Sequence, residues 1–501
     1  MKEVFLVAVM GGKEPFDSAH AEREIQRLHS EPLHVQWSAP SGELLNLTLP
    51  PTVYPPREDT ELLLSVLNEQ RVNPKASWLE IGCGSGVLSW WAAMQGCAVT
   101  ACDVNPLAVA CTRALFSRHD LRADVHEGGP GPSIDGELHQ WGGDQLHDIV
   151  VWNMPYLSAD VLEGGALGPM EEAALTDTDS AGLLSRFLKL VSSGRLLTSQ
   201  GVAFLTVSSN GVGQDAEAMA WSHRLAGRIV ASTTFEDGEV LQVLAVWRPY
   251  AGAPATNVPL TESTNDDVFS SASQVGATVM AGRQTSGRGR HGRSWESQPE
   301  ALMASWLVGD GTSSAHRTID QLRVGEGLVR LVGALSNRAS NAAFLKWPND
   351  LWIQTEEGRL SKAGGVLFEA VTQGSRTRTV LGVGLNTAVV QGNEWGSIGD
   401  VGVHITPYDL HKTVHAMVAS LFESVMGLPS PVDDFDRLSS AVLHGSQQFN
   451  ELFYRNKPTE ILGLSPSGSI ILKGEGEPVD DPESIQSVSY THLTLPTICS
   501  V

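Results

Sequence analysis

The sequence is poor in positive charge. Its 501 residues include 34 Lys and Arg against 57 Asp and Glu, which gives a formal net charge of −23. Nucleic-acid phosphates are bound by clustered Lys and Arg, so this balance argues against a chain that coats DNA or RNA. A single basic loop inside a domain remains compatible with it.

Cysteines and long apolar runs are also scarce. The five cysteines form no C-x-x-C pair and have no partnering His cluster, which favours free thiols in a reducing cytosol over disulfides or a zinc site. The apolar run Val4–Met10 is too short to span a membrane and lacks the basic lead and cleavage site of a signal peptide. We therefore expect a cytoplasmic protein with no dedicated metal-ligand set and no membrane partner.

The chain is long enough for about three domains. Strand and helix patterns alternate as far as Trp247 and predict a doubly wound α/β domain over residues 1–247. Residues 248–259 are rich in Pro, Ala and Gly, as in linkers, and a second αβ region covers residues 260–445. Residues 446–488 alternate short apolar runs with Ser-Gly and Gly-Glu-Gly turns, which predicts a small β-barrel. Residues 489–501 resemble a translated sequencing adapter and are left out of the fold prediction.

The segment SWLEIGCGSGV predicts a nucleoside-binding turn. A strand containing Glu80 leads into Gly82, Gly84 and Gly86 before an apolar helix. Glycines at alternate positions allow a sharp turn and a close approach of the backbone to a ligand, and open α/β sheets bind nucleosides at such turns. The next strand ends in Asp103, an acid placed to bind two ribose hydroxyls. A purely structural glycine turn is the alternative.

A third element, HDIVVWNMPYL, suggests the chemistry of that site. Asn153 offers a side-chain carbonyl and Met154 a main-chain carbonyl, before Pro155 and Tyr156. Two such acceptors bind one planar NH2 group and draw electron density onto its nitrogen, which can then attack an electrophilic methyl group. Tyr156 can pack on the planar group.

With YPPREDTELLL and TACDVNPLAVACTRALF, these residues resemble the HemK/PrmC-type glutamine methyltransferases over residues 50–247. The archaeal and eukaryotic branch is most similar, and it methylates the GGQ glutamine of class I peptide chain release factors. The resemblance implies a class I Rossmann-like fold, S-adenosylmethionine as cofactor and a small activator protein as partner. It also implies cofactor-binding roles for Thr60 and Asn105, and catalytic roles for Asn153, Pro155 and Tyr156.

Met154 departs from the N-P-P-Y tetrad of that family. Because methionine supplies the same main-chain carbonyl, we expect activity to survive, and we expect Met154→Pro to keep or modestly raise it. Apolar residues at this position also occur in adenine-N6 methyltransferases, so an RNA or DNA methyltransferase is an alternative, as is an inactive scaffold.

The loop RQTSGRGRHGRSW predicts a second, phosphate-binding site. Arg288, Arg290 and Arg293 alternate with glycines, including Gly287, between two apolar segments that predict buried strands. Guanidinium groups on such a loop can close over a polyphosphate. A nucleic-acid tail or a solvated linker is the alternative reading of the loop.

Further motifs follow in order: K-W-P-N-D with Lys346, Asn349 and Asp350, then S-K-A-G-G with Lys362, then G-V-G-L-N with Asn386. Together with E-S-T-N-D at residues 262–266 and the arginine loop, they resemble biotin protein ligase over residues 258–480. The resemblance implies an α+β catalytic domain and a two-step reaction. The biotin carboxylate attacks ATP, with Mg²⁺, to give biotinyl-5′-AMP, and a lysine of the biotin carboxyl carrier domain of a carboxylase then attacks this anhydride.

The resemblance implies a role for each motif residue in binding biotin, phosphate or adenine. Ser263, Thr264 and Gln284 would contact the biotin ureido ring, with Asn265 beside them. Arg288 and Lys362 would hold the biotin carboxylate and the α-phosphate, and Arg290 and Arg293 would seal the adenylate. The adenine would lie near Trp295 and Asn386. Lys346 and Asp350 would act on phosphate and on the metal or incoming lysine, with Gly287 and Asn349 completing the site.

The sequence thus predicts a bifunctional fusion of a methyltransferase and a biotin ligase. Some ligases of this type double as repressors through an N-terminal winged helix, so a biotin-sensing regulator is the alternative for the second half. The methyltransferase segment occupies that place here, which disfavours the regulator.

Overall fold

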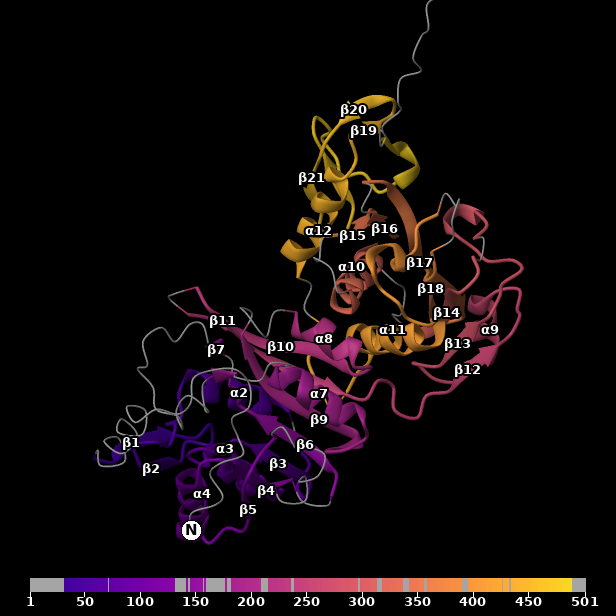
Figure 1. Cartoon of the computed structure of the whole chain (residues 1–501). Helices are drawn as coiled ribbons and strands as arrows, with labels where there is room; N and C mark the ends of the chain where they lie inside the picture. The colour runs from indigo at the N-terminus through magenta and orange to yellow at the C-terminus, as the bar shows by residue number, and fades with distance from the viewer. Residues whose placement is uncertain are drawn as a thin grey trace, which may run out of the picture. The chain divides into compact units, whose positions relative to one another are not determined.

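The computed structural model of the chain describes residues 31–488 apart from 71, 131–140, 143–144, 156, 159–175, 178–181, 209–214, 236–237, 296–297, 313–317, 337–341, 356–357, 390–394, 426 and 432–433. Tyr156, the Val4–Met10 run and the adapter-like tail lie outside the described residues. Two compact units are present (Figure 1): Met1–Arg248 with Ser424–Pro429, and Pro249–Glu423 with Ser430–Val501. Within the described residues, no helix is both long and apolar enough to cross a membrane.

The first unit is built on a seven-stranded sheet, as the alternating pattern predicts. Its spatial order is β10 (Ala226–Thr234), β11 (Val240–Trp247), β9 (Leu197–Ser208), β6 (His147–Trp152), β3 (Ser77–Ile81), β4 (Ala98–Asp103) and β5 (Asp124–Glu127). Strands β9, β6, β3, β4 and β5 are parallel, whereas β11 runs antiparallel to both of its neighbours, β9 and β10. This is a Rossmann-like sheet, whose parallel strands end at one common edge.

The helices of this unit are α2 (Glu58–Glu69), α3 (Val87–Met94), α4 (Pro106–Arg118), α7 (Leu183–Ser192) and α8 (Ala216–Ser222). Separate strand pairs are formed by β1 (Leu33–Ser38) with β2 (Leu44–Leu49), and by β7 (Leu157–Ser158) with β8 (Thr176–Asp177). Helix α3 is apolar on all sides and is buried from Val87 to Ala92, as expected for a helix enclosed by protein. Its burial fixes the glycine turn that precedes it.

The second unit contains another seven-stranded sheet. Its order is β12 (Ala255–Val258), β13 (Thr278–Ala281), β14 (Ala301–Gly311), β18 (Arg376–Asn386), β17 (Leu360–Gln373), β16 (Asp350–Gln354) and β15 (Ala343–Lys346). Only β12 and β13 pair in parallel among these strands. The helices of the unit are α9 (Thr264–Ser271), α10 (Thr318–Leu335), α11 (Pro407–Phe422) and α12 (Phe435–Gln447), with 3₁₀ turns η2 (Arg290–Gly292), η3 (Ile398–Val401) and η4 (Pro482–Ser484).

Strand β12 corrects the predicted linker. Residues 248–259 were expected to be a linker throughout, but Ala255–Val258 pairs with Thr278–Ala281 at the edge of the second sheet. The proline- and glycine-rich part ends at Pro254, and the four residues after it form the edge strand. The ordered second domain therefore begins before residue 260.

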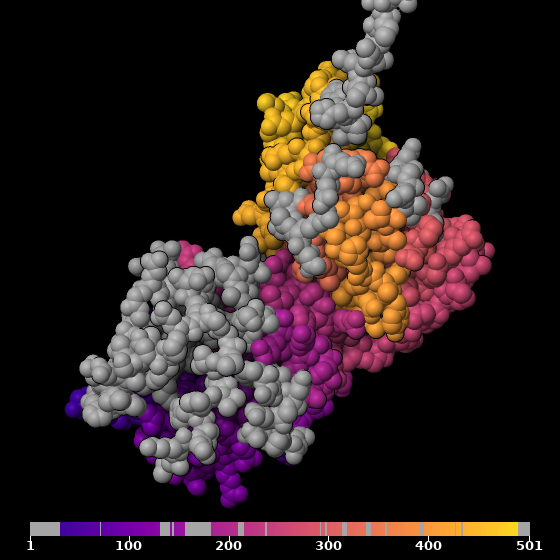
Figure 2. Space-filling model, in the orientation of Figure 1, coloured from indigo at the N-terminus to yellow at the C-terminus, as the bar shows by residue number. Residues whose placement is uncertain are grey.

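The predicted small barrel corresponds to five short strands. Strands β20 (Lys457–Thr459), β19 (Glu451–Tyr454) and β23 (Ile485–Val488) form one sheet, and β21 (Ile461–Leu464) and β22 (Ile470–Leu472) form another. Their closure into a barrel stays a prediction. One hydrophobic core joins Tyr454 and Ile470 to Leu345 and Leu322, across the expected boundary at residue 446. In Figure 2 the yellow atoms of the C-terminal segment adjoin the orange atoms of the same unit.

Two candidate functional sites

A cavity of about 370 Å³ opens at the carboxyl ends of β3, β4 and β6 in the first unit. It gathers most of the residues predicted there from the sequence: Thr60, Glu80, Gly82, Gly84, Asp103, Asn105, Asn153 and Pro155. Gly86 does not line it. A Cβ at Gly86 would lie 2.7 Å from Oγ1 of Thr112, so this glycine serves the packing of α3 on α4.

The glycine turn has a backbone that other residues rarely adopt. Gly82, Gly84 and Gly86 have φ angles of 69°, 48° and 81°, all in the left-handed region. Gly86 is the N-cap of α3, and the Gly84 backbone N–H donates to Oδ2 of Asp103 at 2.8 Å. The turn is therefore fixed from both sides, and the sequence prediction of its shape is confirmed.

Asp103 connects this turn to the next one. Its Oδ1 accepts the backbone N–H of Asn105 at 2.8 Å, and burial raises the pKa of Asp103. Asn105 in turn caps α4 by accepting the Leu107 N–H at 2.9 Å, and its Nδ2 donates to the Thr52 carbonyl at 2.8 Å. Asp103 thus keeps acceptor capacity at the cavity, while the Asn105 side chain is engaged by the protein itself.

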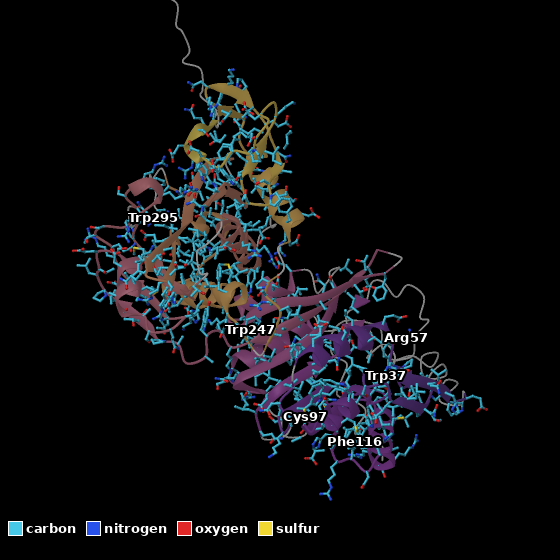
Figure 3. The ribbon with its side chains drawn as sticks, turned by 180° about the vertical axis from the view of Figure 1, so that it is seen from behind. Trp37, Arg57, Cys97, Phe116, Trp247 and Trp295 are labelled. Atoms are coloured by element: carbon cyan, nitrogen blue, oxygen red, sulfur yellow. The ribbon has the colours of Figure 1, made fainter. Side chains whose placement is uncertain are left out.

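Glu80 is buried beneath the turn and accepts a short hydrogen bond from Ser89 on α3. Burial raises the pKa of Glu80 to about 8, which favours the neutral acid at pH 7. On the opposite wall, Tyr54 donates to Asp59 at 3.0 Å and Thr60 N–H donates to the same carboxylate at 2.6 Å. Arg57, labelled in Figure 3, lies over the Tyr54 ring at 5.1 Å.

The Asn153–Met154 turn is held by a residue that the sequence did not single out. Thr206 on β9 is fully buried, and its Oγ1 accepts the Met154 N–H at 2.9 Å and donates to Oδ1 of Asn153 at 2.6 Å. Met154 is itself buried, beside Trp152 in the hydrophobic core. The two predicted acceptors therefore lie at the cavity on a fixed turn.

A larger cavity, of about 790 Å³, lies in the second unit. It brings together residues from five separate motifs: Ser263, Thr264, Asn265, Gln284, Arg288, Arg290, Arg293, Trp295, Lys346, Asn349, Asp350, Lys362 and Asn386. Gly287 does not line it. A Cβ at Gly287 would lie 2.8 Å from the Trp295 carbonyl, and Trp295 N–H donates to the Gly287 carbonyl at 2.8 Å, so this glycine closes the arginine loop on itself.

One end of this cavity is a network of neutral polar groups. Oε1 of Gln284 accepts from both N–H and Oγ1 of Thr264, at 2.8 and 3.0 Å. Oγ of Ser305 on β14 lies within hydrogen-bond distance of Oγ1 of Thr264 and Oδ1 of Asn265, at 2.7 and 2.6 Å, and its single proton can be donated to either. A Cβ at Gly382 would lie 2.6 Å from Oδ1 of Asn265, so β18 needs a glycine to admit α9 here.

Arg288 is oriented by two carboxylates. Its guanidinium donates to both oxygens of Asp266 at 2.7 Å and to Oε2 of Glu369 at 2.9 Å. These hydrogen bonds raise the pKa of Arg288 further above its ordinary value. Glu369 also accepts from Nδ2 of Asn265 at 2.5 Å and so links the arginine to the neutral network.

The other end of the cavity presents buried polar atoms without partners. Among the described residues, Nη1 of Arg290, Nε1 of Trp295 and Oδ1 of Asn386 have no hydrogen-bond partner. Burial lowers the pKa of Arg290. A Cβ at Gly384 would lie 2.8 Å from the Trp295 ring, so the indole lies directly on strand β18. Unpaired buried groups are costly unless a ligand satisfies them.

Two lysines complete this site. Nζ of Lys362 lies 2.6 Å from Oδ1 of Asp350 and 5.7 Å from the Trp295 ring. Nζ of Lys346 lies 4.7 Å from the ring centroid of Trp352 and 5.0 Å from that of Phe449, and burial lowers the pKa of this lysine. Within the described ranges no group of three His, Cys, Asp or Glu side chains could hold a metal ion. The Mg²⁺ expected with ATP stays a prediction.

Comparison with protein families identifies both halves. Residues 57–163 match the family described as methyltransferase small domain, and residues 255–386 match the biotin/lipoate A/B protein ligase family. The chain joins a small methyltransferase domain to a biotin/lipoate ligase domain. The two cavities lie one in each of these domains.

Curated relatives support each domain separately. The methyltransferase domain is 32% identical to the release factor glutamine methyltransferase of Geobacter sulfurreducens, over 28% of this chain and 47% of that protein. It is 30% identical to the ribosomal protein L11 methyltransferase of Nitratiruptor sp., over 26% and 43%. The ligase domain is 26% identical to the human biotin–protein ligase, over 42% and 30%. The chain spans less than half the length of each.

Among solved structures, the Aquifex aeolicus biotin protein ligase in complex with biotin and ATP is 20% identical, with a TM-score of 0.33, and covers 47% of this chain and 96% of that one. The E. cuniculi Mtq2–Trm112 complex, described as responsible for methylation of the eRF1 translation termination factor, is 20% identical with a TM-score of 0.27, over 39% and 99%.

Three residues that contact predicted site residues were not singled out from the sequence. Thr206 in the methyltransferase domain, and Ser305 and Glu369 in the ligase domain, orient predicted site residues from strands that pass beneath them. Each is a single polar residue in an apolar segment, such as FLTV or VLFEA. For Thr206 and Ser305 the signal is a buried polar residue among apolar neighbours, whereas the Glu369 side chain is only partly buried.

Proposed function

We propose that the chain is a bifunctional enzyme. The methyltransferase domain transfers a methyl group from S-adenosylmethionine to the side-chain nitrogen of the GGQ glutamine in a class I release factor. The ligase domain uses ATP and Mg²⁺ to attach biotin to the carrier lysine of a carboxylase through biotinyl-5′-AMP. We assign the first activity to residues up to 247 and the second to residues 255–488.

The observation that supports methyl transfer is the position of Asn153 at the same cavity as the Gly82–Gly84 turn. S-adenosylmethionine supplies an electrophilic methyl group when bound. The left-handed glycines admit the nucleoside close to the backbone, and Asp103 accepts the ribose hydroxyls. Oδ1 of Asn153 and the Met154 carbonyl receive the two N–H groups of the acceptor amide, which orients its nitrogen toward the methyl group.

The observation that supports biotinylation is the set of buried atoms on Arg290, Trp295 and Asn386 that have no hydrogen-bond partner among the described residues. A nucleotide bound over Gly384 would satisfy them, whereas the Thr264–Gln284 network offers neutral donors and acceptors for the biotin ring. Arg288 and Lys362 lie between these two ends and stabilise the negative charge that develops on the transferring phosphate. Closure of the arginine loop excludes water from the reactive anhydride.

The experiment for the methyltransferase is an acceptor panel with labelled S-adenosylmethionine. We expect methylation of a class I release factor and none of its GGQ glutamine-to-alanine variant. Ribosomal protein L11, ribosomal RNA, tRNA and DNA complete the panel, because relatives act on L11 and the adenine-N6 alternative requires nucleic acid. Label in nucleic acid alone would move the domain to the adenine-N6 class, and no label in any acceptor favours an inactive scaffold. The activator that we propose as a partner would be found by copurification.

The experiment for the ligase is biotin-dependent exchange of pyrophosphate with ATP, followed by transfer to a carrier domain and to a carrier whose biotin-accepting lysine is changed. We expect exchange, and transfer to the intact carrier only. Exchange without transfer, together with specific DNA binding that biotin strengthens, would instead support the biotin-sensing regulator.

A further inference from the structure

Thr206 lies where two parallel strands end side by side. Trp152 of β6 is paired with Leu205 of β9, so Asn153 and Thr206 are the next residues on neighbouring strands. The segment Val202–Leu205 is buried and apolar, and Thr206 is equally buried. A valine, which has the same shape, would fill this position without the cost of burying a hydroxyl. The hydroxyl therefore has a role that packing does not explain.

The hydrogen bonds of Thr206 fix the direction of its proton. The Met154 backbone N–H can only donate, so Oγ1 of Thr206 is its acceptor at 2.9 Å. The hydroxyl has one proton left to give, and the amide of Asn153 lies 2.6 Å away. The hydroxyl donates this proton to the amide oxygen, because a reversed amide would present its NH2 group, a donor, and would leave the proton without an acceptor in this contact. The network thus determines that Oδ1, and not Nδ2, of Asn153 points to β9.

We infer that Thr206 is the positioning residue of the methyl-acceptor site, an inference that rests on the proposed methyltransferase function. A carbonyl oxygen has two lone pairs, so Oδ1 of Asn153 keeps one for an N–H of the substrate. If the amide were reversed, its NH2 group would face the NH2 group of the substrate, and donor would oppose donor. Thr206 prevents this reversal and at the same time anchors Met154, whose carbonyl is the second acceptor.

Two variants separate the hydroxyl from the volume of the side chain. Thr206→Val keeps the shape and removes both hydrogen bonds, whereas Thr206→Ser keeps the hydroxyl and removes a methyl group. We expect Thr206→Val to lower kcat for release-factor methylation about 10-fold or more. The reason is that the Asn153 amide loses its orientation and the buried Met154 N–H loses its hydrogen-bond partner. The dissociation constant for S-adenosylmethionine should stay within about twofold, because the glycine turn and Asp103 are untouched. Thr206→Ser should restore kcat to within about threefold of the unchanged chain.

Crystal structures of the full chain and of both variants provide a second readout that does not depend on activity. We expect the contact between the Asn153 amide and the hydroxyl in the unchanged chain and in Thr206→Ser, and a displaced Asn153 amide in Thr206→Val. Unchanged kcat in Thr206→Val, equal losses in both variants, or an Asn153 amide that keeps its place in Thr206→Val would each overturn the inference. If the unchanged chain methylates no release factor, the proposed function fails, and the crystal structures alone then decide whether Thr206 positions Asn153.

Discussion

Lys362 and Asp350 form an ion pair inside the ligase cavity, with 2.6 Å between Nζ and Oδ1. The two residues lie on adjacent antiparallel strands, where Trp352 is the register partner of Lys362. A Cβ at Gly365, the partner of Asp350, would lie 3.2 Å from Oδ1 of Asp350. The glycine therefore leaves room for the carboxylate to hold the ammonium group at the centre of the site.

We expect Lys362→Ala to lower the rate of biotinyl-adenylate formation by about 10²–10³-fold, because it removes a positive charge that stabilises the negative charge on the transferring phosphate. Methyl transfer should be unchanged, since the methyltransferase cavity lies in the other unit. Pyrophosphate exchange and methylation measured on the same preparation check both statements. Equal loss of the two activities would show that the domains are coupled.

Arg290→Gly should release the adenylate from the arginine loop. The side chain is half-buried, and its Nη1 has no hydrogen-bond partner among the described residues. This is expected of a group whose partner is the ligand. Without it we expect biotin to appear on lysines of bystander proteins such as serum albumin, in proportion to their concentration. Arg195→Gly, on the methyltransferase domain, is the matched control and should label only the carrier.

Asp103→Ala should raise the dissociation constant for S-adenosylmethionine by about 10- to 100-fold, as expected for a charged hydrogen bond worth about 1.5–3 kcal/mol. The carboxylate also binds the N–H groups of Gly84 and Asn105, so the loss includes the order of the glycine turn. Asp103→Asn keeps one acceptor oxygen, so its dissociation constant should lie between those of the unchanged chain and Asp103→Ala. Calorimetric titration that gives the same affinity for all three proteins would contradict the assigned role.

Met154→Pro is expected to impair the methyltransferase, in contrast to the expectation from the sequence. Proline has no N–H, and the Met154 N–H donates to Oγ1 of Thr206 at 2.9 Å. The change would free the hydroxyl that orients Asn153, so we expect kcat to fall about 10-fold while the cofactor still binds. Met154→Leu keeps the N–H and the apolar volume and should remain active. A Met154→Pro variant as active as the unchanged chain would restore the sequence-based expectation.

The stability of the ligase domain should decrease in acid because of two buried histidines on α11. Nε2 of His411 forms a hydrogen bond of 3.0 Å with Oγ1 of Thr278, and its ring stacks on Trp306. Nδ1 of His415 accepts a hydrogen bond from Nε1 of Trp306 at 2.9 Å. Burial lowers the pKa of His411 to about 3, aided by His415 and then Lys412, and that of His415 to about 4.

The unfolded chain therefore takes up protons that the folded chain excludes. Well above pH 6.5 these histidines should not affect the free energy of unfolding. As the pH drops from about 6.5 toward 4, the free energy of unfolding should fall by up to about 1.4 kcal/mol per pH unit for each histidine. Urea titrations at several pH values measure this slope. His411→Asn should make it shallower, whereas His404→Asn, at an exposed position, should not.

Much of each site could be predicted because its residues are local in sequence. Gly82 to Gly86, the arginine loop and the K-W-P-N-D turn are short motifs in which backbone shape and chemistry are encoded together. Gly86 and Gly287 belong to these motifs but serve packing and loop closure, a distinction that requires knowledge of what lies against them.

Partners contributed by distant strands could not be predicted. Thr206 is 53 residues from Asn153, and Glu369 is 81 residues from Arg288, so only strand register brings them together. The strand β12 was missed because four residues without alternating polarity carry no periodic signal, and edge pairing alone determines their conformation.

The indole of Trp347 donates to the Gly468 carbonyl at 3.0 Å, within the core that the C-terminal strands share with Leu345. The K-W-P-N-D turn is therefore braced from behind by residues more than a hundred positions later. The second seven-stranded sheet and the C-terminal strands share one hydrophobic core, so we expect them to unfold together, although their sequences suggest two domains. Cutting the gene at residue 446 would not yield a shorter ligase; it would leave half of a hydrophobic core in water and the lysine-bearing strand without its support.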